Sequence, residues 1–199
     1  MIKINTPFYV PFFEKDCEFF EDIRDDLISI IMEIHNKDPF AIQGNFPKGK
    51  LLKYNLTESN SNFLQIEHKS IKKIRSWINQ NLIDSYKIIK IETQKVNIKS
   101  SWFHVTKTGG FHNIHMHPNT PLAAIFYIES GNSDIGNSWI NPITGYIDNL
   151  SSKWCQSTFT SKFVPGKLII FPGWLLHSAP PHQGDKLRIL LSLNSTPIV

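Results

Sequence analysis

Four of the eight histidines of the chain, His104, His112, His115 and His117, fall within fourteen residues. On an extended strand, alternate side chains share a face, so His115 and His117 project together and can offer two imidazole nitrogens to one metal ion. Neutral imidazole suits Fe(II), Zn, Cu and Ni, so the pair predicts a metal site without fixing the metal. The alternative is two ordinary polar residues at a strand end. His112 is an odd number of residues from His115, so we expect it, like His104, to lie beside the site or on the surface.

A third ligand has to come from another part of the chain. His177 directly follows the apolar run of residues 166–176, Gly-Lys-Leu-Ile-Ile-Phe-Pro-Gly-Trp-Leu-Leu. His182 instead follows two prolines and precedes Gln-Gly-Asp, a turn-like context that we expect to be exposed. We therefore predict His177 as the third ligand and keep His182 as its competitor.

Arg188 stands eleven residues after His177, among the apolar neighbours of the segment Lys-Leu-Arg-Ile-Leu-Leu-Ser-Leu-Asn. A guanidinium inside an apolar strand is costly unless an anion pairs with it, and its planar fork matches a carboxylate. A salt bridge to an internal acid, or an edge position that reaches solvent, would also explain it. Strand alternation puts Leu190, Ser192 and Asn194 on the same face as Arg188, so we expect this face to look inward onto an anionic ligand.

The first 85 residues predict two helices. Apolar residues spaced by three and four indicate amphipathic helices over residues 14–35 and 69–84. Two prolines in residues 6–13 favour an extended edge segment, and residues 36–62 suggest an irregular connection with one short strand. We expect the two helices to pack on the outside of a sheet.

From Tyr86 onward the sequence is typical of β structure, with short runs of branched and aromatic residues separated by glycines. This spacing predicts a sandwich or small barrel in residues 86–199, and the whole chain, 1–199, as one domain. Residues 131–155, rich in Gly, Asn and Ser, are expected to form a long loop or hairpin over one mouth of the barrel. A first strand is predicted to begin at Tyr86, and the strands predicted after it span residues 101–106, 111–117, 122–129, 156–164, 167–171 and 187–193.

Composition sets the outer limits. The chain has 199 residues, 41% of them hydrophobic and 19% charged, which predicts a packed globule. The net charge of +4 is scattered and not gathered on one element, so no nucleic-acid partner is expected. No apolar run is long enough for a signal peptide or a membrane span, and the two cysteines, Cys17 and Cys155, are read as reduced thiols; we expect a cytoplasmic protein.

The order of these motifs resembles the Fe(II)/2-oxoglutarate-dependent oxygenases, whose fold is the double-stranded β-helix or jelly roll. The segments that carry the resemblance are Ser101 to Gly109, His115-Met-His117-Pro, Leu122 to Tyr127, Phe171-Pro-Gly-Trp-Leu-Leu-His177 and Arg188 to Asn194. Within that superfamily they are similar to a family of 2-oxoglutarate/Fe(II) oxygenases found in bacteria and marine phages. The resemblance covers the second half of the chain, and the richness in Ile, Asn and Lys fits a phage genome.

The resemblance implies that Fe(II) binds His115, His117 and His177, and that Arg188 pairs with the distal carboxylate of 2-oxoglutarate. It implies an oxidoreductase, a dioxygenase that decarboxylates this cosubstrate to succinate and hydroxylates a primary substrate with O2. That substrate, a small molecule or a protein side chain, is not identified by the sequence, and a homodimer is left open. The other residues implied to line the cosubstrate pocket are Tyr127, Ser192 and Asn194.

One position departs from the wider superfamily. Most members carry a carboxylate two residues after the first histidine, completing a 2-His-1-carboxylate triad, and His117 occupies that position here. A neutral third ligand would change metal affinity and redox behaviour. The alternative is that His117 stays unligated and leaves an additional open position, as in the halogenating branch of the superfamily.

Two other classes of function fit parts of the pattern. Gly109 and Gly166 precede the histidine motifs at spacings that echo cupins, so a three-His cupin dioxygenase without 2-oxoglutarate is an alternative. That reading does not require an anion partner for Arg188. A non-catalytic jelly-roll binding module is the other alternative, and it predicts no metal at the histidines.

Overall fold

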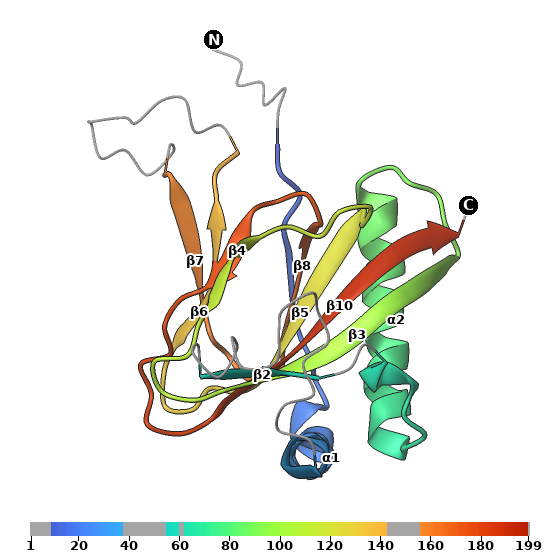
Figure 1. Cartoon of the computed structure of the whole chain (residues 1–199). Coiled ribbons are helices and arrows are strands. Elements are labelled where there is room, and N and C mark those ends of the chain that lie inside the picture. The colour runs from blue at the N-terminus through green and yellow to red at the C-terminus, as the bar shows by residue number, and fades with distance from the viewer. Residues whose placement is uncertain (1–8, 38–54, 60–61, 143–155, 199) are drawn as a thin grey trace.

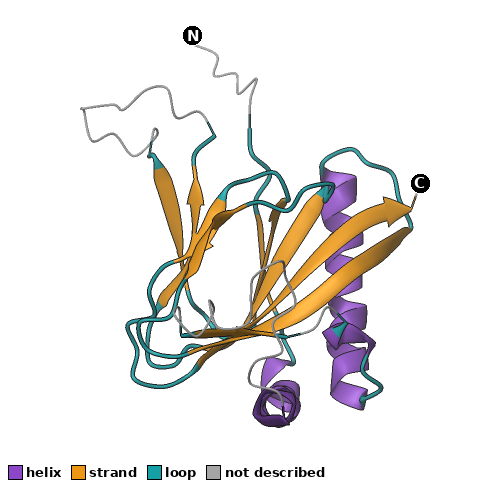
Figure 2. Ribbon diagram, in the orientation of Figure 1, coloured by secondary structure: helices purple, strands orange, loops and turns teal. Residues whose placement is uncertain are grey.

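The protein is described by a computed structural model that covers residues 9–37, 55–59, 62–142 and 156–198. Two antiparallel sheets face each other, and two helices lie outside the larger one (Figures 1 and 2). The larger sheet has the strand order β1-β8-β5-β10-β3-β2 and the smaller one β4-β9-β6-β7. The elements are β1 (Phe13–Asp16), α1 (Phe20–Lys37), β2 (Leu56–Glu58), α2 (Lys69–Ile88), β3 (Lys95–Thr106), β4 (His112–His115), β5 (Leu122–Glu129), β6 (Ile135–Ile140), β7 (Thr158–Lys162), β8 (Lys167–Pro172), β9 (His177–Ala179) and β10 (Arg188–Ile198). This arrangement confirms the predicted mostly β jelly roll with flanking helices.

Strand β10 shows how alternation separates the two layers of the core. Ile189, Leu191 and Leu193 belong to the hydrophobic cluster that the helices share with the larger sheet. Leu190 belongs to a second cluster with Tyr127 of β5, Trp139 of β6 and other side chains between the two sheets. The predicted face of Arg188, Leu190, Ser192 and Asn194 is therefore the one directed between the sheets.

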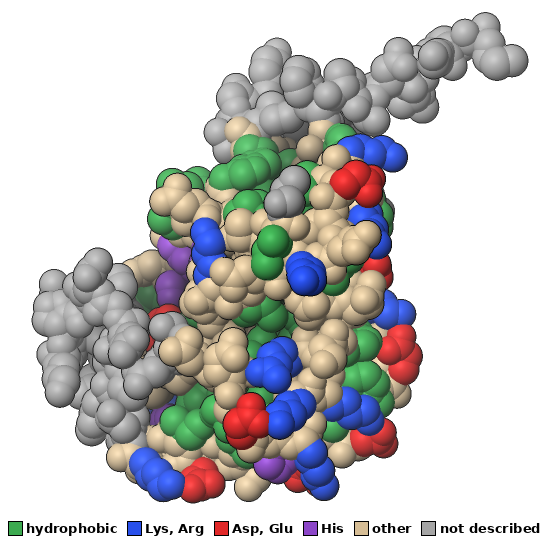
Figure 3. All heavy atoms as spheres, turned by 90° about the vertical axis from the view of Figure 1, so that its right-hand side faces the viewer, with side chains coloured by type: hydrophobic (Ala, Val, Ile, Leu, Met, Phe, Trp, Pro, Cys, Tyr) green, Lys and Arg blue, Asp and Glu red, His purple; other side chains and the backbone are tan. Residues whose placement is uncertain are grey.

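The helices are attached to each other by polar contacts as well as by apolar packing. Ser70 Oγ donates a hydrogen bond to Asp26 at 2.5 Å, and Lys73 Nζ lies 3.2 Å from Asp22. On the face that contains α2, lysines and arginines are interspersed with acidic side chains (Figure 3). Neither described helix combines the length and the apolar character that a membrane crossing requires.

The predicted start of the first helix is wrong. Residues 14–16 belong to β1, which pairs with β8 in the register Phe13 with Ile170, and α1 begins only at Phe20. The helical spacing of apolar residues continues into this segment, but sheet hydrogen bonds supply the backbone partners there. Tertiary pairing therefore overrides the local periodicity.

The boundary between α2 and the following strand is also misplaced. Tyr86 was predicted to begin a strand, but α2 runs to Ile88, and the buried Tyr86 hydroxyl contacts Ser195 Oγ at 3.1 Å. Lys90, two residues past the end of the helix, has φ +66°, and its N–H donates to Lys87 O while the Ile91 N–H donates to Tyr86 O. This is the Schellman geometry that glycine usually provides, so the sequence gives no visible end signal.

The segment predicted as a loop over residues 131–155 contains a strand. Residues 135–140 form β6, which pairs with both β7 and β9, and its polar residues Asn137 and Ser138 hide its strand character in the sequence. Gly136 is required because a Cβ there would lie 2.6 Å from the Tyr127 hydroxyl oxygen. The remainder of that prediction, residues 143–155, lies outside the described residues.

Candidate functional site

Three histidines converge at the edge of the smaller sheet. His115 ends β4, His177 begins β9, and the two are register partners in adjacent antiparallel strands. His117 follows two residues later, and its backbone N–H donates to Gly173 O. One ring nitrogen from each of the three lies within 4.8 Å of the other two, and the Nε2 atoms of His117 and His177 are 3.2 Å apart. This separation suits two neighbouring ligands of one ion, each about 2.1 Å from it.

Backbone carbonyls fix which nitrogen of the ligand rings is free. His177 Nδ1 lies 2.9 Å from Leu175 O, and His115 Nδ1 lies 2.8 Å from Asn113 O. A carbonyl oxygen can only accept, so both Nδ1 atoms carry the proton and both Nε2 atoms keep a lone pair for a metal. His117 interacts with the Asn194 side chain, which raises the pKa of the ring against the larger opposing effect of burial.

Burial keeps the three rings neutral. It lowers the pKa of His115 to about 3 and those of His117 and His177 to about 4, with repulsion from neighbouring histidines acting in the same direction. Three neutral imidazoles whose ring nitrogens converge form a donor set that suits a divalent transition metal. The described residues therefore fit the predicted metal site.

The rings border a cavity of about 440 Å³ between the two sheets. His104 and His112, predicted to lie beside the metal or on the surface, both line this cavity, and the His112 ring centre is 4.1 Å from that of His115. Burial lowers the pKa of both. Apolar and polar groups share the rest of the wall, namely Trp102, Ile114, Ala124, Ile125, Asn137, Phe171, Ala179 and Ser192.

The cavity has an acidic residue that the sequence did not single out. Glu58, at the end of β2, lines it with its carboxylate 3.9 Å from His112 Nε2 and 4.0 Å from His104 Nε2. Its signal in the sequence is weak, because it lies in a connection dominated by Asn and Ser. Only the pairing of β2 with β3, Glu58 opposite His104, brings it to the histidines.

Arg188 is 2% exposed and has no acidic partner among the described residues. Its Nη1 and Nη2 atoms share one weak acceptor, Pro180 O, at 3.4 Å each, and its Nε atom has no hydrogen-bond partner. Burial lowers the pKa of Arg188 to about 10. An arginine side chain stays charged in proteins, so a buried cation is left short of an anion. This fits a carboxylate ligand and excludes a salt bridge to any of the described acidic residues as the explanation.

The three residues predicted to line the cosubstrate pocket differ in how free they are. Ser192 lines the cavity. Asn194 contacts His117 and donates from Nδ2 to Ser100 Oγ at 3.1 Å. The Tyr127 hydroxyl is buried and already bonded, 2.8 Å from Ser161 Oγ and 2.9 Å from the Asn137 backbone nitrogen that donates to it. Tyr127 is near enough to raise the pKa of Arg188, but its hydroxyl is already bonded to Ser161 and Asn137.

His182 is buried, so the prediction that it is exposed is wrong. It is 2% exposed, and its Nε2 lies 2.7 Å from Lys186 O. The ring fits because Gly131 and Gly184 leave space, since a Cβ at either would approach it within 2.6 and 2.8 Å. His182 is not among the converging rings, and its role is to hold the turn before β10.

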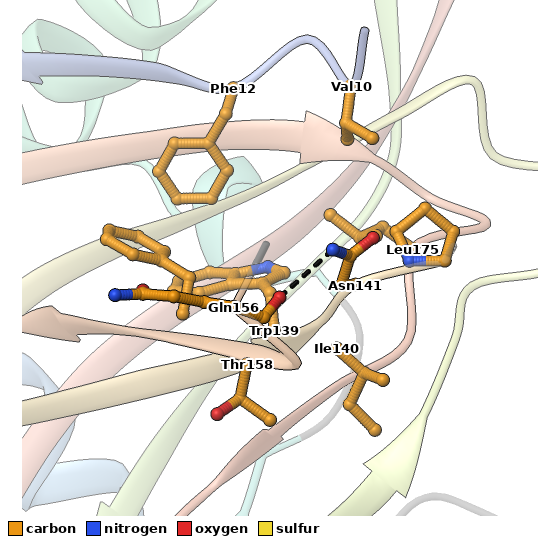
Figure 4. A pocket seen from close by; sticks show the side chains of 10 residues that line it. Val10, Phe12, Trp139, Ile140, Asn141, Gln156, Thr158 and Leu175 are labelled. Atoms are coloured by element: carbon orange, nitrogen blue, oxygen red, sulfur yellow. Dashed lines mark hydrogen bonds between the residues drawn. The ribbon is translucent and has the colours of Figure 1, made fainter. Parts of the chain in front are cut away.

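A second cavity, of about 390 Å³, is lined mainly by apolar side chains and shares no lining residue with the first (Figure 4). Val10, Phe12 and Leu175 lie around Trp139, whose indole is 3% exposed. Trp139 therefore packs in the core, whereas Trp174 is half exposed.

Residues 100–194 match the family described as "Putative 2OG-Fe(II) oxygenase". Among solved structures, a Pseudomonas putida prolyl-4-hydroxylase is similar over 93% of this chain and 92% of its own, with 12% identity and a TM-score of 0.67. The viral collagen prolyl hydroxylase of Paramecium Bursaria Chlorella virus-1, in its 2-oxoglutarate complex, is similar over 95% and 97% with 16% identity and a TM-score of 0.58.

A third similar structure contains a metal and the keto acid. HygX from Streptomyces hygroscopicus, with nickel and 2-oxoglutarate bound, matches 94% of this chain and 83% of its own, at 8% identity and a TM-score of 0.60. At such identities these likenesses establish the fold. No curated protein matches the chain.

Proposed function

We propose that His115, His117 and His177 hold Fe(II) and that Arg188 binds the distal carboxylate of 2-oxoglutarate, because residues 100–194 match a 2OG-Fe(II) oxygenase family and three histidines converge there. The observation that carries this proposal is the pairing of two incomplete sites in one barrel. Three neutral imidazoles converge without a cation, and a buried guanidinium lies between the same sheets without an anion. A metal-bound keto acid completes both.

The chain is thus an Fe(II)- and 2-oxoglutarate-dependent oxygenase, and we propose hydroxylation as its reaction. When held by these histidines, the iron would supply the activation of O2 that couples decarboxylation of 2-oxoglutarate to succinate and CO2 with conversion of a substrate C–H group to C–OH. The residues of the chain bind and orient the reactants. Leu175 O and Asn113 O hold two ligand rings in place, and the apolar wall keeps water away.

The position of His117 favours hydroxylation over the halogenating alternative. Its Nε2 is 3.2 Å from that of His177, close enough for both to bind one ion. Halogenation needs an additional open position, and a ligating His117 would occupy it.

The cupin alternative does not account for Arg188. A three-His dioxygenase that uses no 2-oxoglutarate would leave this buried cation without a partner among the described residues. The binding-module alternative leaves the convergence of three lone pairs unexplained. Both readings are therefore weaker than the oxygenase proposal.

The direct test is anaerobic reconstitution with Fe(II), followed by addition of O2 and 2-oxoglutarate and measurement of succinate. We expect slow succinate formation without a primary substrate and faster formation with the correct one. A three-His cupin dioxygenase would bind iron and form no succinate. A binding module would retain no iron.

We further propose that residues 1–199 form one domain, because one hydrophobic cluster joins α1 and α2 to the strands of the larger sheet. We also propose a cytoplasmic location, to which the free, buried thiol of Cys17 is suited. A phage origin rests on composition alone. No nucleic-acid partner is proposed, and a homodimer is left to be tested by sedimentation.

A further inference from the structure

Glu58 lies where the edges of the two sheets meet. It is the final residue of β2, an edge strand of the larger sheet, and it faces His112 of β4, an edge strand of the smaller sheet. Both side chains line the cavity that contains the three predicted metal ligands. Glu58 is therefore placed to contact whatever the cavity accepts beside the metal.

Among the described residues, no donor is recorded for the Glu58 carboxylate. No lysine or arginine of this part of the chain lies within ion-pair distance of it or lines the cavity. Burial raises the pKa of Glu58 to about 7. An acid in this state is stabilised by any positive charge that enters the cavity.

The two histidines next to Glu58 offer acceptors rather than donors. Trp102 Nε1 can only donate, and it does so to His104 Nε2 at 2.7 Å, so that nitrogen carries no proton. His112 Nδ1 lies 3.1 Å from Asn113 O and must donate to it, which leaves a lone pair on Nε2 of the neutral ring. The nitrogens nearest to Glu58 thus cannot satisfy its carboxylate.

The distances leave room for one donor atom between these acceptors. Glu58 Oε2 and His112 Nε2 are 3.9 Å apart, too far for a hydrogen bond. A nitrogen placed about 2.8 to 2.9 Å from each would donate to both at an angle near 90°. Trp102 adds an aromatic surface to the same wall, which also favours a cation.

We infer that the primary substrate presents a cationic nitrogen, such as a protonated amine, which Glu58 and His112 bind beside the metal. This inference rests on the proposed function, because it places the substrate in the same cavity. It divides the charges of the site: the acidic cosubstrate is held by Arg188, and the basic substrate is held by Glu58 at the meeting edges of the sheets.

The test uses n-butylammonium and its neutral counterpart 1-butanol as probes. The full chain, loaded with Zn(II) and 2-oxoglutarate, is titrated with each probe, and the affinity is measured by saturation-transfer NMR. We expect wild-type protein to bind the ammonium at least about tenfold more tightly than the alcohol, as a charge-assisted hydrogen bond implies. Glu58→Gln should lose this preference and leave the affinity for the alcohol unchanged.

Glu92→Gln is the matched control, because it removes the same charge from an exposed position outside the cavity. It should keep the wild-type preference. Equal binding of the two probes by wild-type protein would overturn the inference without any variant. An unchanged preference for the ammonium in a folded Glu58→Gln protein would also overturn it.

Zn(II) and 2-oxoglutarate binding are measured on the same samples. If both bind and the ammonium preference is absent, only the substrate inference fails. If wild-type protein binds neither, the proposed function fails, and this inference falls with it.

Discussion

Replacing Arg188 with methionine should separate the stability of the protein from its affinity for 2-oxoglutarate. Burial lowers the pKa of Arg188 from its ordinary value to about 10, which at 1.36 kcal/mol per pKa unit corresponds to roughly 3 kcal/mol against the buried charge. Without cosubstrate this cost is not offset by an acid. Arg188→Met removes the charge and keeps most of the volume, so we expect the cosubstrate-free variant to be more stable, by roughly 1–3 kcal/mol.

Cosubstrate binding should change in the opposite direction. Removing one partner of a buried, hydrogen-bonded charge pair costs roughly 2–4 kcal/mol, which corresponds to an affinity loss of about 30- to 1,000-fold. At a 2-oxoglutarate concentration about 100 times the wild-type Kd, the wild-type protein gains about 2.7 kcal/mol of stability. The variant should gain less than about 1 kcal/mol under the same conditions.

Urea unfolding of the Zn(II)-loaded proteins, with and without 2-oxoglutarate, measures both effects. Arg24→Met is the control, because Arg24 has an acidic partner, Glu129, at 2.5 Å. That variant should lose stability and keep the full gain from 2-oxoglutarate. If Arg188→Met is stabilised by 2-oxoglutarate as much as wild type, Arg188 does not bind the cosubstrate and the reasoning is refuted.

Three further predictions concern the histidines and the wall of the cavity. His177→Ala should abolish stoichiometric Zn(II) binding in calorimetry, whereas His182→Ala should keep it and lose roughly 1–2 kcal/mol of stability with its buried hydrogen bond; the reverse result would show that His182 is the ligand. The metal-free protein should lose stability in acid, because burial holds the pKa of His115 at about 3 and those of His117 and His177 at about 4, while the unfolded chain takes up protons below its ordinary pKa of 6.5. Stability from these rings is complete above that value and should fall by about 1 kcal/mol per ring between pH 7.5 and 5.5, so equal urea midpoints at the two pH values would contradict the neutral buried rings. Tyr127→Phe should lower stability by about 1–3 kcal/mol, since it removes a hydroxyl on which buried groups depend, and should leave Zn(II) affinity unchanged; a loss of metal binding would place this hydroxyl closer to the chemistry than the structure does.

The histidine convergence could be predicted because each step depends on local geometry. The two-residue spacing predicted that His115 and His117 share a side, and their rings do converge, although β4 ends at His115 and His117 lies just beyond it. The apolar run of β8 leads within a few residues to His177, which begins β9. The alternation along β10 likewise turned Arg188 and Ser192 toward the interior. These inferences need only strand periodicity and the cost of burying charge.

What could not be predicted depends on pairing between distant segments. Glu58 joins the site only because β2 lies beside β3, a register that no local pattern encodes. His182 is buried because Gly131, some fifty residues earlier, lies against its ring. The end of α2 could not be predicted, because Lys90, just beyond it, takes the left-handed conformation that a glycine normally signals.

The two sheets differ in how their side chains are covered. Both helices pack on the outer side of the larger one, whereas the smaller one holds His115 and His177 and leaves large apolar side chains exposed beside them. Ile114, Met116 and Leu176, each 42% exposed or more, alternate with His115, His117 and His177 along the backbone. Substitutions at these three exposed positions should therefore change the surface beside the proposed metal site, one residue away from each proposed ligand, without disturbing the buried core.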